Sequence, residues 1–582
     1  METLAALDYL IIVGMLIVSA LIGVFFAIRQ QSVSDYFLGN RHMSVFPVAI
    51  SLTATFISAI TYLGTPAEVY IHGPKYGLMA TLRTFVPIVI VYCFIPVFYR
   101  LKITTVYEYL EMRFNNTVRF LVLASEFVGG FIYMGIVVYT PALALSTVTG
   151  LNLTFSILAI GVVCTFYTSI GGIKAVIWTD VFQAFAMVIG AIIMIIAGTV
   201  SIGGPAEGWR RAAEGGRDHL VDFNIDPTIR LTFWSIYIGG TSFLIMIGGT
   251  KQSFVQRYLS CKSESDARMA AWVGMIGTAV MELLAVATGM TIFAYYHVCD
   301  PLTSGEISRA DQIVPYFMMD IFQSVPGLPG LLISGAFCAS LSSMSSVLNS
   351  IASIAGQDIV KTIWPDMTDA TYSLVVKVIS AVFGLVTIAL AFLASVLGDV
   401  LQTALSIAGI TGGPAFGVYI LGLFVPRCNS KGAAVGMIGG TLVGLFLYLG
   451  SRFYPPISHR PPLSVEGCDA LLNETSSSMY NDVATELFTV SDTNTVESVL
   501  SERPPGTAMF AISYLYLTTV NALVCVILGV VVSYVTSWNK PQKVDPKLLA
   551  PIIARSFISL VQDHEEKDKP PSPTDYLPLS KV

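Results

Sequence analysis

The stretch CASLSSMSSVLNSIAS (residues 338–353) carries seven serines and one asparagine inside a segment that otherwise reads as membrane-embedded. The hydrocarbon core offers no water, so polar side chains placed there must find hydrogen-bond partners within the protein. A single membrane serine usually bonds to the carbonyl four residues earlier or allows close helix packing. Four hydroxyls within five positions instead predict a binding site, and they belong to Ser342, Ser343, Ser345 and Ser346.

The composition of the whole chain is that of a polytopic membrane protein. Of its 582 residues, 54% are hydrophobic and 12% are charged, and the mean hydropathy is +0.71. Apolar windows of about 20 residues, enough to cross roughly 30 Å of hydrocarbon, recur about thirteen times, which predicts an all-α protein with about 13 transmembrane helices. The predicted spans are 8–28, 45–65, 80–99, 120–147, 154–170, 179–202, 232–254, 270–296, 328–355, 373–396, 400–424, 432–450 and 511–537.

The distribution of positive charge predicts the orientation in the membrane. Every second loop holds most of the lysines and arginines, beginning with Arg29 and Arg41. By the positive-inside rule these loops are cytoplasmic, which places the N-terminus outside and the C-terminus inside. Two glycosylation acceptors, Asn152 and Asn473, then fall outside. The first span follows no charged region and no cleavage site, so we expect it to be retained rather than removed as a signal peptide.

No enzyme signature is present in the sequence. There is no Walker A loop, no HExxH and no CxxC pair, and the six histidines do not cluster in a span. The net charge of −6, without a basic run, gives no sign of a nucleic-acid partner. We therefore expect neither an enzyme nor an organic cofactor, and the classes left open are an ion-driven carrier, a channel and a solute sensor.

Two apolar segments contain weak points. Segment SLTATFISAITYLGTP (51–66) mixes hydroxyl residues into an apolar span and closes with Gly64 and Pro66, and span 232–254 carries two glycine pairs. If five spans repeat in the inverted sense as five more, each weakened helix comes first in its half, the pattern of carriers that bind solute and ions at the midplane.

That pattern predicts the domain organisation of the chain. The units are an N-terminal extra helix with its inner loop (1–44), the first inverted repeat (45–202), an outer loop (203–231), the second inverted repeat (232–424), an additional helix (425–450), a glycosylated outer loop acting as a cap or tether (451–510), the last helix (511–537) and a disordered cytoplasmic tail (538–582). Cys299 and Cys468 fall in outer loops, where a disulfide is permitted, although sequence does not supply its geometry.

Four motifs of the chain together indicate a protein family. They are PVFYRLKITTVYEYLEMRF (96–114), GGIKAVIWTDVFQ (171–183), VQRYLS (255–260) and SSMSSVLNS (342–350). This set resembles the sodium/solute symporter family, and in particular its branch of iodide, monocarboxylate and multivitamin carriers. The likeness covers roughly residues 8–450 and the last span, and is more specific for the family than for the branch. It implies a LeuT-like inverted five-helix repeat and sodium-coupled uptake.

The resemblance also implies a sodium site. Carried over by position, its ligands are the hydroxyls of Ser342 and Ser343 with the carbonyls of Ala54, Ile57 and Ala339. Asp180 matches an acidic residue that supports sodium binding in relatives, the alternative being a residue that caps the next helix. Ser345 and Ser346 match positions linked to a second sodium in some members, and the resemblance leaves open whether this chain has one.

Departures from the family's sugar carriers bear on the substrate. Those carriers have an aromatic residue near position 247 and a glutamine near position 61, whereas this chain has Ile247 and Thr61, which argues against sugar. Arg83 lies inside the third span at a position of polar substrate contact, and its planar fork suits a carboxylate. Snorkelling to water is the alternative. We place the substrate contacts at Arg83, Phe56, Thr61 and Ile247.

Together these features predict a plasma-membrane symporter that imports a small organic anion, a monocarboxylate or a carboxylate-bearing vitamin, with Na⁺ as the co-transported ion. An inorganic anion such as iodide, a non-transporting sensor and a channel remain the alternatives. The chain ends in Ser580-Lys581-Val582, which fits the C-terminal ligands of PDZ-type domains, so a partner of that kind joins the lipid bilayer and the solute as expected partners.

Overall fold

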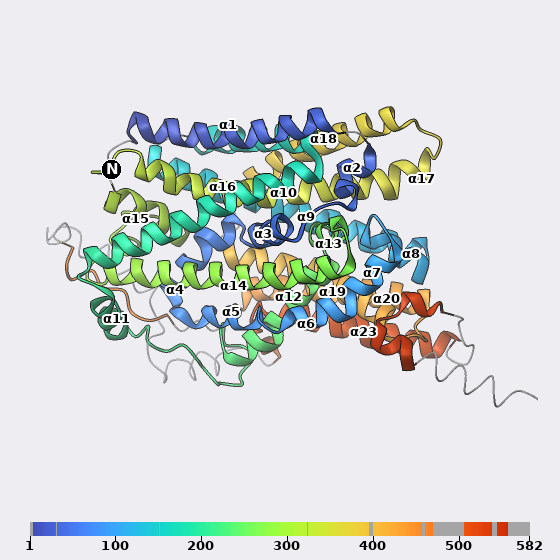
Figure 1. Cartoon of the computed structure of the whole chain (residues 1–582). Helices are drawn as coiled ribbons and strands as arrows, with labels where there is room; N and C mark the ends of the chain where they lie inside the picture. Colours follow the sequence, from blue (N-terminus) through green and yellow to red (C-terminus); the bar gives the residue numbers. More distant parts are fainter. Residues whose placement is uncertain are drawn as a thin grey trace, which may run out of the picture.

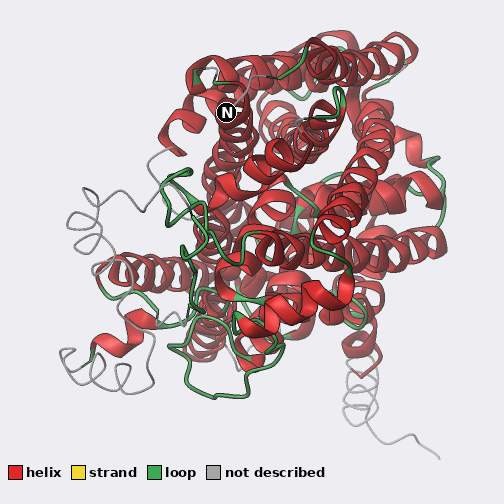
Figure 2. Cartoon of the chain, turned by 90° about the vertical axis from the view of Figure 1, so that its left-hand side faces the viewer, coloured by secondary structure: helices red, strands yellow, loops and turns green. Residues whose placement is uncertain are grey.

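The computed structural model describes residues 4–30, 32–150, 152–322, 324–394, 400–456, 460–468, 506–537 and 544–556. In these ranges the chain is helical, and its only β-pairing is an isolated bridge between Met43 and Cys261. The long helices lie side by side with their axes in roughly one direction (Figure 1). Loops gather at the end seen in Figure 2. The prediction of an all-α fold is confirmed.

The first half of the described chain contains a series of helices separated by short 3₁₀ or π-helical turns. The helices are α1 (Ala6–Arg29), α2 (Val33–Leu38), α3 (Val45–Phe56), α4 (Thr65–His72), α5 (Met79–Leu82), α6 (Val86–Val89), α7 (Ile95–Leu101), α8 (Val106–Arg113), α9 (Asn116–Thr149), α10 (Leu153–Ser201) and α11 (Pro205–Glu214). The turns are η1 (Gly39–Arg41), η2 (Ile60–Gly64), η3 (Pro74–Leu78) and η4 (Ile90–Phe94).

The second half follows the same pattern. Its helices are α12 (Thr241–Thr250), α13 (Gln252–Ser260), α14 (Glu264–Tyr295), α15 (Ile313–Phe322), α16 (Leu328–Ile354), α17 (Lys361–Ile363), α18 (Asp369–Ala394), α19 (Val400–Phe424), α20 (Ser430–Phe453) and α23 (Tyr516–Ser537). The turns are η5 (Ser235–Gly240), η6 (Ala310–Gln312), η7 (Ala355–Val360), η9 (Thr507–Ala511) and η10 (Pro546–Leu548).

Ten helices in the described ranges are long and apolar enough to cross a membrane, or eleven with one bent pair, against about thirteen predicted spans. The difference has two sources. Helix α10 has 49 residues, which at 1.5 Å per residue is about 74 Å, more than twice the hydrocarbon thickness. Gly172 interrupts it with φ 66° and ψ −173°, so α10 contains two spans. The apolar stretch Ser235–Thr250 is a separate, shorter helix, and each predicted window therefore coincides with a helix.

The bent pair is the broken helix that the sequence predicted, although the break lies elsewhere. Helix α3 ends at Phe56, Ile57 leaves the helical region with ψ 81°, and the axis turns by 56° before α4. Gly64 and Pro66 lie beyond this break, with Pro66 in the first turn of α4. Because η2 and α4 form one helical segment, Ile60–His72, Pro66 lies inside it, and the segment lacks the hydrogen bond that an N–H at this position would donate.

The second weakened span breaks at Lys251, between α12 and α13, where the backbone is extended (ψ 129°). The glycine pairs that drew attention to this span serve close packing instead. A Cβ on Gly239 would stand 2.5 Å from the carbonyl oxygen of Leu515, and one on Gly248 would stand 2.5 Å from Ile90. Glycine is therefore required here to bring neighbouring segments into contact, not to open the backbone.

Part of the C-terminal tail is ordered, which corrects the expectation of disorder over 538–582. Residues 544–556 lie against the ends of α7, α8 and α19, and Leu549 and Ala550 are fully buried. Arg100 donates to the carbonyls of Lys547 and Leu549 (2.6 and 2.8 Å), and the Ala550 amide donates to the Leu423 carbonyl (3.1 Å). This contact buries two apolar residues and provides hydrogen-bond partners for several backbone groups. The composition of the tail did not reveal it.

Candidate functional site

The predicted serine stretch belongs to α16 and meets a carboxylate there. Asp180 of α10 is fully buried and accepts a hydrogen bond from the Ser342 hydroxyl (2.6 Å). Its other oxygen accepts from the Ser51 hydroxyl of α3 (2.5 Å) and from Nη2 of Arg257 in α13 (2.8 Å). Four helices that are far apart in the chain thus converge on one buried carboxylate.

Arg257 is the residue of this centre that sequence reasoning missed. Its side chain is 1% exposed, and besides Asp180 it donates to the hydroxyls of Ser51 (2.7 Å) and Ser346 (2.5 Å). From sequence, Arg257 had no assigned role, and Asp180 was expected to support sodium binding or to cap a helix. In the structure the cation beside Asp180 is Arg257. The signal that could have shown this is the set of polar residues Gln252, Gln256 and Arg257, all buried on one short helix.

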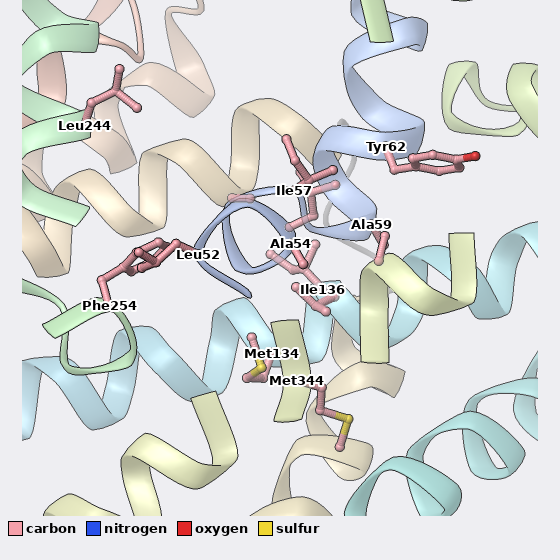
Figure 3. Close-up of a cluster of buried hydrophobic side chains, with 14 of the residues drawn as sticks. Leu52, Ala54, Ile57, Ala59, Tyr62, Met134, Ile136, Leu244, Phe254 and Met344 are labelled. Atoms are coloured by element: carbon pink, nitrogen blue, oxygen red, sulfur yellow. The ribbon is translucent and has the colours of Figure 1, made fainter. Parts of the chain in front are cut away.

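The five predicted sodium ligands are all buried around the broken helix. Ala54 lies in the last turn of α3 and Ile57 directly follows it, so both lie where helical carbonyls lack intrahelical partners. Ala339, Ser342 and Ser343 lie on α16, which packs against α3. Figure 3 shows Ala54 and Ile57 at the break, with side chains of α9 and Met344 nearby.

The hydroxyl of Ser343 is the clearest free ligand group in this region. Its oxygen is buried and has no hydrogen-bond partner in the described part of the chain. A buried hydroxyl without a partner is costly, and hydroxyl and carbonyl oxygens are the ligands that hard cations take. Ser343 and the break carbonyls therefore suit a cation better than they suit plain helix packing.

The two serines considered for a second sodium are engaged within the protein. The Ser345 hydroxyl donates to the Ser342 carbonyl (3.1 Å), and the Ser346 hydroxyl donates to the same carbonyl (2.6 Å). Ser346 also accepts a hydrogen bond from Nη2 of Arg257, and its hydroxyl lies 3.2 Å from the Thr55 hydroxyl. These bonds back to α16 are the ordinary role of a membrane serine.

Arg83, the predicted substrate contact, is buried and ion-paired. It follows α5, and its Nη2 lies 2.9 Å from Oε2 of Glu282 in α14, with side-chain exposures of 6% and 0%. Its guanidinium carbon lies 5.3 Å from the ring centre of Phe56, which itself packs on Phe254 (4.4 Å between ring centres). The alternative of snorkelling to water is therefore wrong. Sequence reasoning missed Glu282, although an acidic residue in the middle of span 270–296 could have signalled it.

The remaining predicted residues are placed as follows. Thr61 lies in η2 and Ile247 in α12, both half-buried. Asn152 is exposed at the start of α10, where its side chain accepts from the Thr154 amide (2.8 Å). Cys299 and Cys468 are joined by a disulfide with a Cα–Cα distance of 5.1 Å. Asn473 and the C-terminal PDZ-type motif lie outside the described residues.

A polytopic helical bundle with a buried polar centre at the break of a helix defines a membrane carrier rather than an enzyme. Comparison with known proteins agrees with this class. Residues 36–440 match the sodium:solute symporter family. The mouse sodium-coupled monocarboxylate transporter 2 is 40% identical over 94% of this chain and 86% of that protein. The human sodium/iodide cotransporter is 36% identical over 97% and 88%.

A solved structure of a Na⁺-coupled sialic acid symporter, in a substrate-bound outward-open state, has the same fold. Its TM-score is 0.74 at 25% identity, and the match covers 92% of this chain and 100% of that one. The chain belongs to the sodium:solute symporter family. It is thus a transporter with a LeuT-like fold, and Na⁺ is its co-transported ion.

Proposed function

We propose that the protein imports a small monocarboxylate, or a carboxylate-bearing vitamin, together with sodium across the plasma membrane. The observation that carries this proposal is the buried guanidinium of Arg83 beside the broken helix. Its Nε and Nη1 have no hydrogen-bond partner in the described part of the chain. Donors of this kind suit a carboxylate, because the planar guanidinium binds two oxygens at once.

Sodium binds in this proposal at the carbonyls of Ala54, Ile57 and Ala339 and the hydroxyls of Ser342 and Ser343. Ion binding holds the break of α3 in one shape. Phe56, the residue before Ile57, contacts Arg83, so the shape of the break also sets the wall of the anion site. Two ligands that favour the same conformation strengthen each other's binding.

Transport follows by alternating access. With both ligands bound, the outer side closes and the inner side opens, and sodium leaves into a cytoplasm that is poor in sodium. The N-terminus lies outside in this arrangement. A disulfide between Cys299 and Cys468 suits the oxidising outer side of the membrane, which supports the orientation that positive charges predict.

Iodide-type transport is the second candidate function. The 36% identity to the human sodium/iodide cotransporter favours it, and an arginine serves an inorganic anion as well as a carboxylate. It is the weaker proposal, because the sodium-coupled monocarboxylate transporters reach 40% identity.

The experiment is uptake into proteoliposomes that hold the purified full-length chain. We expect an inward sodium gradient to drive a labelled short-chain monocarboxylate to a concentration above that outside. Unlabelled monocarboxylates should compete, and iodide and sugars should compete weakly. Sodium-driven iodide accumulation that carboxylates do not inhibit would favour the second candidate. Binding without accumulation would instead identify a sensor, and flux independent of sodium a channel.

A further inference from the structure

The ion pair of Arg83 with Glu282 has a consequence for the anions that the site accepts. Glu282 lies in α14 and is completely buried, and α14 packs directly against α5. Since the carboxylate neutralises the guanidinium, Arg83 contributes hydrogen-bond donors to the site but no net positive charge. A buried arginine without such a partner would instead attract any nearby anion, whatever its charge.

The guanidinium still has unused hydrogen-bond donors for one carboxylate group. Glu282 engages Nη2 alone, while Nε and Nη1 of Arg83, and Oε1 of Glu282, have no hydrogen-bond partner among the described residues. Each Nη nitrogen carries two hydrogens, one on each side. Glu282 accepts from only one of the two Nη2 hydrogens. The other Nη2 hydrogen then stays available, side by side with either the Nε hydrogen or an Nη1 hydrogen. That pair matches the two oxygens of a single carboxylate.

Arg83 has no second complete pair of N–H donors left for another carboxylate of the same solute. That carboxylate would lie close to the negative charge of Glu282, which is ion-paired with the same guanidinium. Like charges a few ångströms apart in a buried setting repel strongly because the surroundings screen them poorly. The Phe56 and Phe254 rings next to Arg83 offer apolar contact instead. They suit the hydrocarbon part of a monocarboxylate.

We propose that Glu282 is a specificity-determining residue, which neutralises Arg83 and thereby restricts the site to anions with one carboxylate. This inference rests on the proposed carboxylate transport and adds the reason for excluding dicarboxylates. Glu282 acts through Arg83 and through its own charge.

The test compares a monocarboxylate and a dicarboxylate of equal chain length as inhibitors of labelled monocarboxylate uptake in proteoliposomes. In the unaltered protein the monocarboxylate should inhibit much more strongly. Glu282→Gln keeps the shape of the side chain and removes its charge. In this variant we expect the ratio of the two inhibition constants, that of the dicarboxylate divided by that of the monocarboxylate, to fall by on the order of tenfold. Glu282→Asp, which keeps the charge, should preserve the ratio.

Glu126→Gln is the matched control. Glu126 of α9 forms an ion pair with Lys251 at the second break (2.5 Å), so the same change of charge is made away from Arg83. The ratio of inhibition constants should stay as in the unaltered protein. If Glu126→Gln lowered the ratio as much as Glu282→Gln, the effect would be one of overall charge, and the inference would be overturned.

Glu282→Gln leaves Arg83 buried without a counter-charge and can fail to fold for that reason. The double variant Arg83→Gln with Glu282→Gln removes both charges and covers that case. We expect it to reach the membrane and to bind both anions weakly with little preference. A double variant that still excluded the dicarboxylate would show that discrimination lies elsewhere.

The outcomes separate this inference from the proposed function. If the unaltered protein takes up no carboxylate, the proposed function itself fails. If it takes up monocarboxylates but accepts dicarboxylates equally well, or if Glu282→Gln reaches the membrane with an unchanged ratio, only the role of Glu282 fails. A lowered ratio in Glu282→Gln with a preserved ratio in Glu282→Asp supports it.

Discussion

The buried charges at the two candidate sites occur as ion pairs whose members lie far apart in the chain. Asp180 and Arg257 are 77 positions apart, and Arg83 and Glu282 are 199 positions apart. Removing one partner of a buried pair commonly costs about 3–5 kcal/mol, because the other charge stays buried without compensation. The effect of replacing one of these residues must therefore be interpreted together with the charge of the partner that remains.

Ser343 provides the most direct test of the sodium site. Ser343→Ala removes a buried hydroxyl that bonds to nothing else described, so we expect apparent sodium affinity to fall at least several-fold while the protein still reaches the membrane. Ser342→Ala should also lower it, and in addition loses the bond to Asp180. Ser334→Ala, whose buried hydroxyl bonds to the Gly330 carbonyl of the same helix, is the matched control and should have little effect. The measurement is the sodium dependence of uptake. Unchanged sodium dependence in both Ser342→Ala and Ser343→Ala would exclude these serines from the site.

Arg83 provides the test of the anion site. Arg83→Lys keeps the charge that balances Glu282 but loses the planar fork, and Arg83→Gln loses both. Half-saturation for a monocarboxylate should therefore rise in Arg83→Lys and rise further in Arg83→Gln. Sodium binding measured without substrate should change much less, because the proposed sodium ligands lie at the end of α3 and on α16 and not on α5. Arg83→Gln with normal half-saturation would rule out the guanidinium as the anion contact.

At the level of single elements, the positions of the helix breaks are only partly predicted by where glycine and proline occur in the sequence. The break after α3 lies at Ile57, and the break after α12 lies at Lys251, neither of them a glycine or proline. Gly172, inside α10, is different. Its φ of 66° is in the left-handed region, and a Cβ there would stand 2.8 Å from the Tyr36 ring and 3.0 Å from the Tyr36 carbonyl oxygen.

Replacing Gly172 with alanine should therefore destabilise the protein. The backbone conformation of Gly172 (φ 66°, ψ −173°) is essentially restricted to glycine and costs a residue with a Cβ about 1–3 kcal/mol, and the contact with the Tyr36 backbone adds to that. We expect a lower melting temperature of the detergent-solubilised protein and less protein at the cell surface. Gly14→Ala is the control, because a Cβ on Gly14 meets nothing within 4 Å. Equal melting temperatures for the two variants would contradict this account of the α10 break.

At the level of the whole molecule, the ends of the chain hold distant helices together. Near the N-terminus, Asp8 of α1 accepts hydrogen bonds from the amides of Gly327 and Gly330 at the start of α16 (2.9 and 2.8 Å). At the other end, residues 544–556 bind to α7, α8 and α19, where the Tyr109 hydroxyl donates to the Leu548 carbonyl (3.1 Å). These contacts thus join segments outside the two predicted repeats to helices within them.

Truncation tests the contribution of the tail. A chain that ends after Ser556 keeps the bound segment, whereas one that ends after Ser537 loses it. The shorter chain lacks Leu548 and Leu549, which are buried against the bundle, and burying one leucine contributes about 1.5–3 kcal/mol. We expect a clearly lower melting temperature for the shorter chain and a normal one for the longer chain. Equal melting temperatures would show that the segment adds nothing to stability.

The sequence by itself determined the membrane class, the helical fold, the broken first helix of the core and the helix that carries the serines. These features depend on local patterns: apolar runs of membrane length, hydroxyl residues within them and short motifs. The tertiary structure decided which side chains meet. It paired Asp180 with Arg257 and Arg83 with Glu282, placed the breaks at Ile57 and Lys251, and bound residues 544–556 to the bundle. The physical reason is that a buried charge is stabilised by whichever partner the fold brings within about 3 Å, and that partner lies on another helix at a sequence distance no local pattern encodes.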